Sequence, residues 1–368
     1  MTNVRRRDGG IVIERYVVYG VGGVGKTTVA AALAVALARR GTRTLVVTTD
    51  PARRLADALA VAPSSEVVPV PWCTGLDCYM PDARSTPRSV AAALLQGTPH
   101  AEALVRNPVF ELLCSGLAGV HELATLASLG PRAAGYAAIV IDTAPSRHAI
   151  ELVSLPGRID ALLESRALQW LGRLAQRGNE PRGITQRLID WGPRRLIERF
   201  EGALGTSAVR DTLAVVGAIA SIRPRLLETI RLAGDILTGP STRHLVVLAP
   251  RSGSEQDARF FTEELAAAGL RPSHYLINRI SSEVPAWATE LAASPQLAPE
   301  LSAAVALAEI ESKATVEAAD QIAEMLARIT PGAALVRIPT MSETTPAAVV
   351  TAVASHLERF MLDRGAAS

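Results

Sequence analysis

One stretch constrains this chain more than any other: residues 20–28 read Gly-Val-Gly-Gly-Val-Gly-Lys-Thr-Thr. They fit the pattern G-x-x-x-x-G-K-[ST], in which glycines let backbone N–H groups approach phosphate oxygens. A strand-like run, residues 15–19, precedes the pattern, and an Ala/Leu-rich run, residues 29–40, follows it. The stretch therefore predicts a phosphate-binding loop between a strand and a helix, whose N-terminus also favours anions.

Two side chains of this loop carry the expected chemistry. Lys26 is predicted to neutralise the β- and γ-phosphates of ATP, and the Thr27 hydroxyl to ligate Mg²⁺. Of the 38 basic residues only Lys26 and Lys313 are lysines, so lysine stands here where a compact charge suits the site better than a planar guanidinium. The predicted nucleotide-binding residues of the loop are Gly22, Gly23, Val24, Gly25, Lys26, Thr27 and Thr28.

Composition excludes several other classes of function. A net charge of +2 and an aromatic content of 4% give no basic or stacking surface for nucleic acid. The three cysteines (Cys73, Cys78 and Cys114) form no C-x-x-C pair, which argues against a zinc site or a disulfide framework. No apolar run is long enough to span a bilayer and the N-terminus lacks a signal-peptide pattern, so we expect a cytoplasmic protein.

Apolar runs typical of buried strands recur along the chain. After residues 15–19 they lie at 44–49, 136–142, 244–248, 274–278 and 334–338. Strands that alternate with helical stretches predict an α/β fold, a doubly wound and mostly parallel sheet of the P-loop NTPase type, with a helical subdomain inserted. We assign 11–80, 131–151 and 241–345 to the ATPase core, 81–130 and 152–240 to the helical subdomain, and 346–368 to a C-terminal helix.

Three carboxylates follow predicted strands and form candidates for metal binding and catalysis. Asp50 and Asp142 each end an apolar strand, and a carboxylate at that edge beside a phosphate loop is placed to hold Mg²⁺. Asp57 lies seven residues after Asp50 and is a candidate for orienting or deprotonating the attacking water. Asp50 or Asp57 taken alone would be read as a helix-capping or surface aspartate.

Taken in order, the loop and two further motifs resemble the ArsA family, which includes the arsenite-pump ATPase and the eukaryotic ATPase that guides tail-anchored proteins. The further motifs are Asp-Pro-Ala-Arg-Arg-Leu-Ala-Asp, residues 50–57, and Asp-Thr-Ala-Pro-Ser-Arg-His, residues 142–148. The resemblance runs from about residue 15 to residue 345. It implies an Mg-dependent ATPase whose nucleotide state switches a dimer and which handles an anion or a membrane-protein client.

The resemblance also implies roles for individual residues. Asp50 matches the position that approaches Mg²⁺, Asp142 the metal-holding carboxylate of the Walker B strand, and Asp57 the water-activating position. Asn278 is similar to the residue that reads adenine, a role that its amide donor and acceptor permit. Pro339 corresponds to a late loop near the base.

Two departures from the family pattern keep alternatives open. Family members carry a second lysine after the first loop glycine that reaches the partner's phosphates, and here that position is Val21. A switch position that is normally glycine is Arg147, and Arg147, Arg53 and Arg54 are candidate internal cations. We therefore expect weak turnover by the isolated protein, as a homodimer or paired with a lysine-bearing paralogue. The alternative function is a low-turnover regulatory subunit in such a heterodimer.

Overall fold

The computed structural model describes most of the 368-residue chain. The described residues are 13–52, 54–98, 104, 107–116, 119–144, 151–166, 194–293 and 299–359. The candidate cations Arg53 and Arg147, and His148 at the end of the motif at 142–148, lie outside these ranges.

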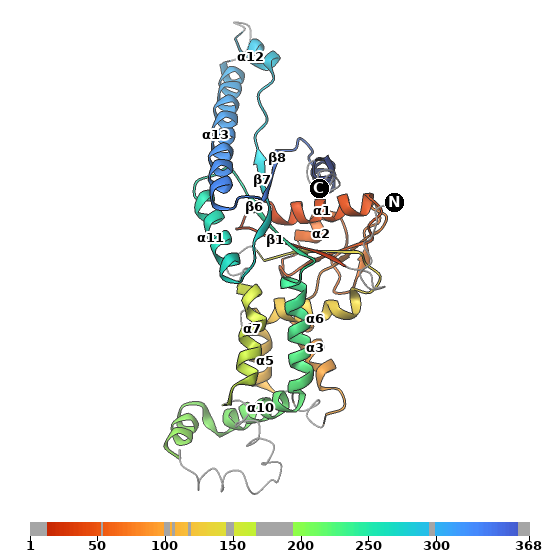
Figure 1. Cartoon of the computed structure of the whole chain (residues 1–368), viewed down its shortest axis with the longest axis vertical. Coiled ribbons are helices and arrows are strands. Elements are labelled where there is room, and N and C mark those ends of the chain that lie inside the picture. Colours follow the sequence, from red (N-terminus) through yellow and green to blue (C-terminus); the bar gives the residue numbers. More distant parts are fainter. Residues whose placement is uncertain are drawn as a thin grey trace. The chain divides into compact units, whose positions relative to one another are not determined.

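An eight-stranded sheet in the order β3-β4-β2-β5-β1-β6-β7-β8 forms the centre of the fold (Figure 1). All neighbouring pairs are parallel except β3 with β4, which is antiparallel at one edge. The strands are β1 (Glu14–Tyr19), β2 (Thr44–Thr48), β3 (Val68–Pro69), β4 (Leu76–Tyr79), β5 (Ala138–Asp142), β6 (Thr242–Leu248), β7 (Pro272–Ile280) and β8 (Ala334–Pro339). The predicted α/β fold with a mostly parallel sheet is therefore confirmed.

Some helices connect these strands, and the others form a separate helical group. They are α1 (Lys26–Arg39), α2 (Arg54–Leu59), α3 (Ser85–Leu95), α5 (Pro108–Gly116), α6 (Val120–Arg132), α7 (Glu151–Glu164), α10 (Arg194–Thr238), α11 (Ser254–Ala267), α12 (Ala286–Ala292), α13 (Pro299–Ile329) and α14 (Pro346–Leu357). In the described part of the chain, every helix is too short or too polar to cross a lipid bilayer.

Helix α1 is buried along nearly its whole length and fixes the phosphate loop to the core. Residues 29–38 are all buried, and most of them are alanine or valine. Small side chains let the helix lie close to the sheet on one side and to α14 on the other, where Val350, Val353 and Leu357 join the same apolar cluster. The helix that carries Lys26 at its first position is therefore held rigidly.

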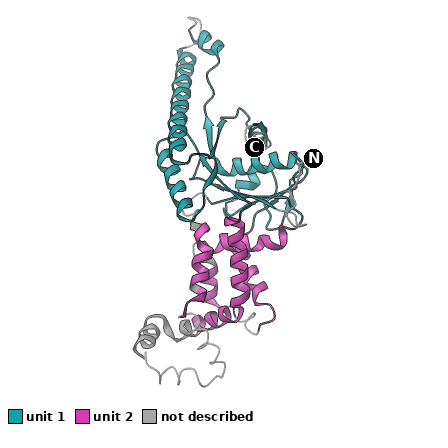
Figure 2. Ribbon diagram, in the orientation of Figure 1, with its two compact units in different colours: residues 1–80, 135–150, 240–368 teal, residues 81–134, 151–239 magenta. Residues whose placement is uncertain are grey.

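The chain divides into two compact units (Figure 2). Unit 1 consists of residues 1–80, 135–150 and 240–368 and contains the whole sheet. Unit 2 consists of residues 81–134 and 151–239, and the secondary structure of its described residues is helical. Two small apolar clusters hold unit 2 together, one around Leu95, Phe110 and Ile222 and one around Leu163 and Ile230.

Candidate functional site

The loop between β1 and α1 has a backbone conformation that glycine residues favour. Gly23 and Gly25 have φ angles of 84° and 88°, in the left-handed region that glycine adopts without strain. Gly25 is the N-cap of α1, so the helix begins at Lys26. A Cβ atom at Gly25 would lie 2.3 Å from Nδ2 of Asn278, whereas a Cβ at Gly23 would meet nothing within 4 Å. An alanine at Gly25 would therefore have to displace the Asn278 amide, in addition to adopting a backbone conformation that favours glycine.

This difference gives a matched pair of variants. We expect Gly25→Ala to weaken nucleotide binding at least tenfold and to lower the free energy of unfolding by about 2–4 kcal/mol, because left-handed strain and a steric clash combine. Gly23→Ala has the same backbone strain without the clash and should cost about 1 kcal/mol. Urea unfolding and calorimetric titration with ADP measure both quantities. Equal losses in the two variants would contradict the packing argument.

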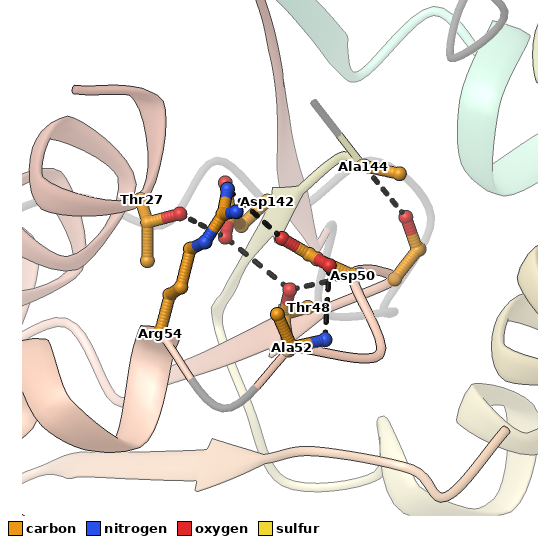
Figure 3. A network of polar contacts seen from close by, with 8 residues as sticks. Thr27, Thr48, Asp50, Ala52, Arg54, Asp142 and Ala144 are labelled. Carbon is orange, nitrogen blue, oxygen red and sulfur yellow. Dashed lines mark hydrogen bonds and ion pairs between the residues drawn. The ribbon is translucent and has the colours of Figure 1, made fainter. Parts of the chain in front are cut away.

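Two neighbouring strand ends bring a carboxylate to the first turn of α1. Asp142 is the last residue of β5, and its Oδ2 atom accepts hydrogen bonds from the Thr27 hydroxyl at 2.9 Å and from the Thr48 hydroxyl at 3.2 Å (Figure 3). β2 and β5 are parallel and paired, with Thr48 opposite Asp142, so their carboxyl ends meet at one edge of the sheet. The structure therefore brings together Thr27 and Asp142, two of the residues predicted to hold Mg²⁺.

The second oxygen of this carboxylate is unused. Asp142 is fully buried, and its Oδ1 atom has no hydrogen-bond partner among the described residues. Burial raises the pKa of Asp142 to about 6, although Lys26 and the hydroxyls of Thr27 and Thr48 act in the opposite direction. A buried carboxylate oxygen without a partner destabilises the protein unless a cation or a proton binds it.

That oxygen fits a magnesium ion. The Thr27 hydroxyl and the carboxylates of Asp50 and Asp142 are hard oxygen ligands of the kind that Mg²⁺ prefers. No group of three or more His, Cys, Asp or Glu side chains in the described ranges forms a complete metal site. Mg²⁺ typically uses one or two carboxylates together with substrate phosphates, and the residues present match that pattern.

The raised pKa of Asp142 predicts a pH dependence of stability. Its folded-state value of about 6 lies above the ordinary 3.8, so proton binding by this group stabilises the fold below about pH 4, and the effect is lost as pH rises through about 6. Between those limits the nucleotide-free protein should lose up to about 3 kcal/mol relative to Asp142→Asn. Urea unfolding of both proteins without Mg²⁺ at several pH values measures this. A difference that does not vary with pH would contradict it.

Asp50 and Arg54 lie beside Thr27, Thr48 and Asp142, and we call these five residues the polar cluster. The Asp50 backbone N–H donates to the Thr48 hydroxyl at 3.0 Å, and its Oδ1 atom accepts from the Ala52 N–H at 2.9 Å. Its Oδ2 atom lies 3.6 Å from the guanidinium of Arg54, with which it forms an ion pair (Figure 3). The sequence motif at 50–57 thus brings a carboxylate and an arginine together beside the loop.

Lys26 lies inside this cluster of charges. Its side chain is 5% exposed, and burial lowers its pKa, while the carboxylates of Asp142 and Asp50 act in the opposite direction and Arg54 adds to the lowering. Two cations, Lys26 and Arg54, therefore face two carboxylates before any nucleotide is bound.

The end of β7 contacts the phosphate loop from the other side. The Asn278 side-chain amide donates to the Val24 carbonyl at 2.8 Å, and the Arg279 guanidinium donates to the Gly23 carbonyl at 2.8 Å. Arg279 has a φ angle of 63°, and the pairing of β7 with β8 shifts register at this point. The irregularity lets two consecutive side chains reach the same loop, where an ideal strand would direct them to opposite faces.

The other predicted residues lie around this centre in different ways. Pro339 ends β8 and pairs with Ile280, two residues after Asn278. Asp57 is exposed on α2, and no hydrogen bond or ion pair links its carboxylate to the described part of the polar cluster. Val21 is half-buried against the apolar core. Arg279 was not predicted as a residue of the site, because nothing in the sequence after Asn278 indicates that the next residue has a left-handed backbone conformation.

Comparison with known proteins gives one family. The sequence model of the anion-transporting ATPases, ArsA ATPase, matches residues 14–205. An arsenical pump-driving ATPase of Acidiphilium multivorum is 26% identical over 287 residues, which cover 75% of this chain and 41% of the relative. An ATPase ASNA1 homolog of Paramecium tetraurelia is 32% identical over 37% of this chain and 42% of the relative. The ATPase get3 of Aspergillus terreus is 30% identical over 65% of this chain and 74% of the relative. The match thus spans about two fifths of the length of the first two relatives.

Proposed function

This chain belongs to the anion-transporting ATPase family, and on that premise we propose that it binds ATP with Mg²⁺ and hydrolyses it. The observation that carries the proposal is the fully buried Asp142, which accepts a hydrogen bond from Thr27 through one oxygen, while its other oxygen has no hydrogen-bond partner in the described part of the chain. That arrangement lies at the first turn of the helix that follows a phosphate-loop motif, where both phosphates and their counter-cation are expected to bind.

Different residues of the chain are proposed to have different roles in ATP binding and hydrolysis. The N–H groups of the loop and the first turn of α1 bind and orient the phosphates, and Lys26 neutralises charge on the β- and γ-phosphates. Thr27, Asp50 and Asp142 are the residues that would hold Mg²⁺, which when bound supplies charge neutralisation at the phosphate oxygens. Asn278 and Pro339 are proposed to lie near the adenine. With the Asn278 amide bonded to Val24 through one N–H, its second N–H and its carbonyl oxygen remain for the base.

For the attacking water we propose Asp57 as the group that orients it and accepts its proton. Oδ1 and Oδ2 of Asp50 are already engaged, by the Ala52 N–H and Arg54, whereas the Asp57 carboxylate is exposed. Asp57→Asn should therefore keep the affinity for ATP and slow turnover at least tenfold, a barrier increase of about 1.4 kcal/mol or more.

Asp50→Asn is the matched control for this assignment. It should weaken Mg²⁺-dependent ATP binding, because it removes a proposed metal ligand. Calorimetric titration and phosphate release separate binding from turnover. If Asp57→Asn hydrolyses ATP at the native rate while Asp50→Asn binds ATP normally and turns over slowly, the base is Asp50.

We propose further that the nucleotide state switches a dimer that handles an anion or a membrane-protein client in the cytoplasm, and the name of one relative supports the anion. One relative is named an arsenical pump-driving ATPase. The partner chain is either a second copy or a paralogue that carries the lysine missing at Val21. In the second case the present chain is a low-turnover regulatory subunit, an alternative that the valine favours.

Phosphate release by the pure protein tests the proposal, with Mg²⁺ and with excess chelator, alone and mixed with a lysine-bearing paralogue. We expect slow Mg²⁺-dependent release by the chain alone and faster release in the mixture. Absence of ATP binding by the folded protein would contradict the nucleotide site. ATP binding without phosphate release, both alone and in the mixture, would contradict hydrolysis by this chain and favour the regulatory-subunit alternative.

A further inference from the structure

Strand β7 has one residue more than β8 at the end that contacts the phosphate loop. Ile277 is paired with Arg337, and Ile280 is paired with Pro339. Three steps along β7 therefore correspond to two steps along β8, which is a β-bulge. Arg279 lies in this bulge with a φ angle of 63°, in the left-handed region that glycine adopts without strain. Backbone strain of this kind at an arginine is typical of positions that serve a function.

Hydrogen bonds after the bulge fix the course of the backbone. The Ile280 carbonyl accepts a hydrogen bond from the Thr340 N–H at 2.8 Å, and Thr340 directly follows β8. The Ser281 N–H donates to the hydroxyl of Thr315, on α13, at 3.2 Å. The residue after Arg279 and the one following it are thus tied to two other segments, so the arginine extends from a backbone that is held in place.

The Arg279 side chain contacts the phosphate loop and no other polar group in the described part of the chain. Its Nη1 atom donates to the Gly23 carbonyl at 2.8 Å. Its Nε atom lies 3.9 Å from the position that a Cβ atom would take at Gly25. The side chain is exposed, and its guanidinium forms no ion pair with a carboxylate of the described residues. The contact therefore acts on the conformation of the loop.

Two consecutive residues of β7 bind two consecutive carbonyls of the loop. Arg279 binds the carbonyl of Gly23. Asn278 binds the carbonyl of Val24, also at 2.8 Å. In a trans peptide the N–H of the next residue points away from the carbonyl, so these two bonds turn the N–H groups of Val24 and Gly25 toward the opposite side of the loop. Neither N–H donates a hydrogen bond to a described residue.

These N–H groups belong to a backbone of the kind that binds anions. Gly23 and Gly25 have positive φ angles and Val24 does not, and such alternation directs successive N–H groups into one concave site. We propose that Arg279 is a positioning residue for phosphate binding. Its bond to the Gly23 carbonyl holds these N–H groups in the orientation that a polyphosphate chain requires before the ligand arrives, which lowers the cost of ordering the loop. The proposal rests on the proposed function, because it concerns the same loop.

Calorimetric titration of the full-length chain with inorganic tripolyphosphate and with ADP, both with Mg²⁺, tests this role. Arg279→Met keeps the strained backbone but removes the donor, so both ligands should bind at least tenfold more weakly. Arg279→Lys restores a donor and should bind both ligands within about threefold of the native chain. Arg279→Gly removes the strain together with the donor. It should bind as weakly as Arg279→Met and yet unfold at a higher temperature than that variant.

Two variants are matched controls. Ala60 is the other non-glycine residue with a positive φ angle among the described residues, 51°, so Ala60→Gly relieves similar strain away from the loop. Arg271 is exposed directly before β7, so Arg271→Met removes the same charge from the opposite end of that strand. Both controls should bind tripolyphosphate and ADP as the native chain does. Circular dichroism verifies that each variant is folded.

The proposal is overturned if Arg279→Met binds tripolyphosphate with native affinity, or if the affinities of the Arg279 variants follow their unfolding temperatures. Loss of affinity for ADP alone also overturns it, because Arg279 would then contact the base. In a Gly23→Ala background Arg279→Met should cost less affinity, since both changes disturb the same carbonyl. An equal cost would assign the guanidinium to the phosphates themselves and overturn the positioning role. If the folded native chain binds neither ligand, the proposed function itself fails, which is a different result from native binding that survives Arg279→Met.

Discussion

Lys26→Ala is expected to weaken ATP binding at least hundredfold, about 2.7 kcal/mol, and to remove hydrolysis. Lys26 is the only lysine near the loop, and its buried ammonium lies in the field of Asp142 and Asp50. Without it, Arg54 would be the cation that remains beside Asp50 among the described residues, so the phosphates of ATP would meet the carboxylates of Asp50 and Asp142 with less positive charge to balance them. Calorimetric titration with ATP and phosphate release measure the two losses.

The chain provides its own control for this variant. Lys313 is the one other lysine, and it is exposed on α13. Lys313→Ala removes the same positive charge from the protein and should leave ATP affinity and turnover unchanged. Thermal unfolding shows whether each variant is folded. A folded Lys26→Ala protein with native ATP affinity would disprove the assignment of the loop.

The parallel sheet and part of the site were predictable because local sequence alone determines them. Runs such as 44–49 and 136–142 are apolar without alternation, as strands buried on both faces require. Asp142 ends such a run, so its position at the carboxyl edge of the sheet could be predicted from the strand. The hydrogen bonds of its buried carboxylate could not be predicted, because they come from Thr27 and Thr48 on other elements.

Contacts between distant segments were not predictable. Asn278 and Arg279 reach the loop only because the register between β7 and β8 shifts at this point, which no local pattern encodes. Helices α12 and α13 give the converse case. Their apolar residues look like core residues in the sequence, whereas Trp287, Leu307 and Ile310 are exposed in the structure.

The second large effect concerns the charge missing at Val21. Hydrolysis spreads negative charge over the equatorial oxygens of the γ-phosphate, and an additional cation accelerates such reactions by about 10³–10⁵. Valine supplies no charge, and Val21 packs against the apolar core. We therefore expect slow turnover by the native chain and at least a tenfold increase in Val21→Lys, about 1.4 kcal/mol in barrier.

Val21→Met is the control, since it lengthens the side chain without adding charge. Turnover should rise with protein concentration in Val21→Lys if the lysine acts across a dimer, and a lysine-bearing paralogue should stimulate the native chain in the same way. A rate that is equal in Val21→Lys and Val21→Met would show that position 21 does not face a phosphate in the active assembly.

An internal arginine is the competing source of the cation, and the structure separates the candidates. Arg54 forms an ion pair with the Asp50 carboxylate (Figure 3), whereas Arg53 and Arg147 lie outside the described residues. If Arg54 serves this role, Arg54→Ala should slow the native chain at least tenfold and have less effect in Val21→Lys, because the two cations would then act on the same transition state. Arg147→Ala should slow turnover only if that arginine is the substitute. Fast hydrolysis by the native chain that survives alanine at all three arginines would contradict both sources of the charge.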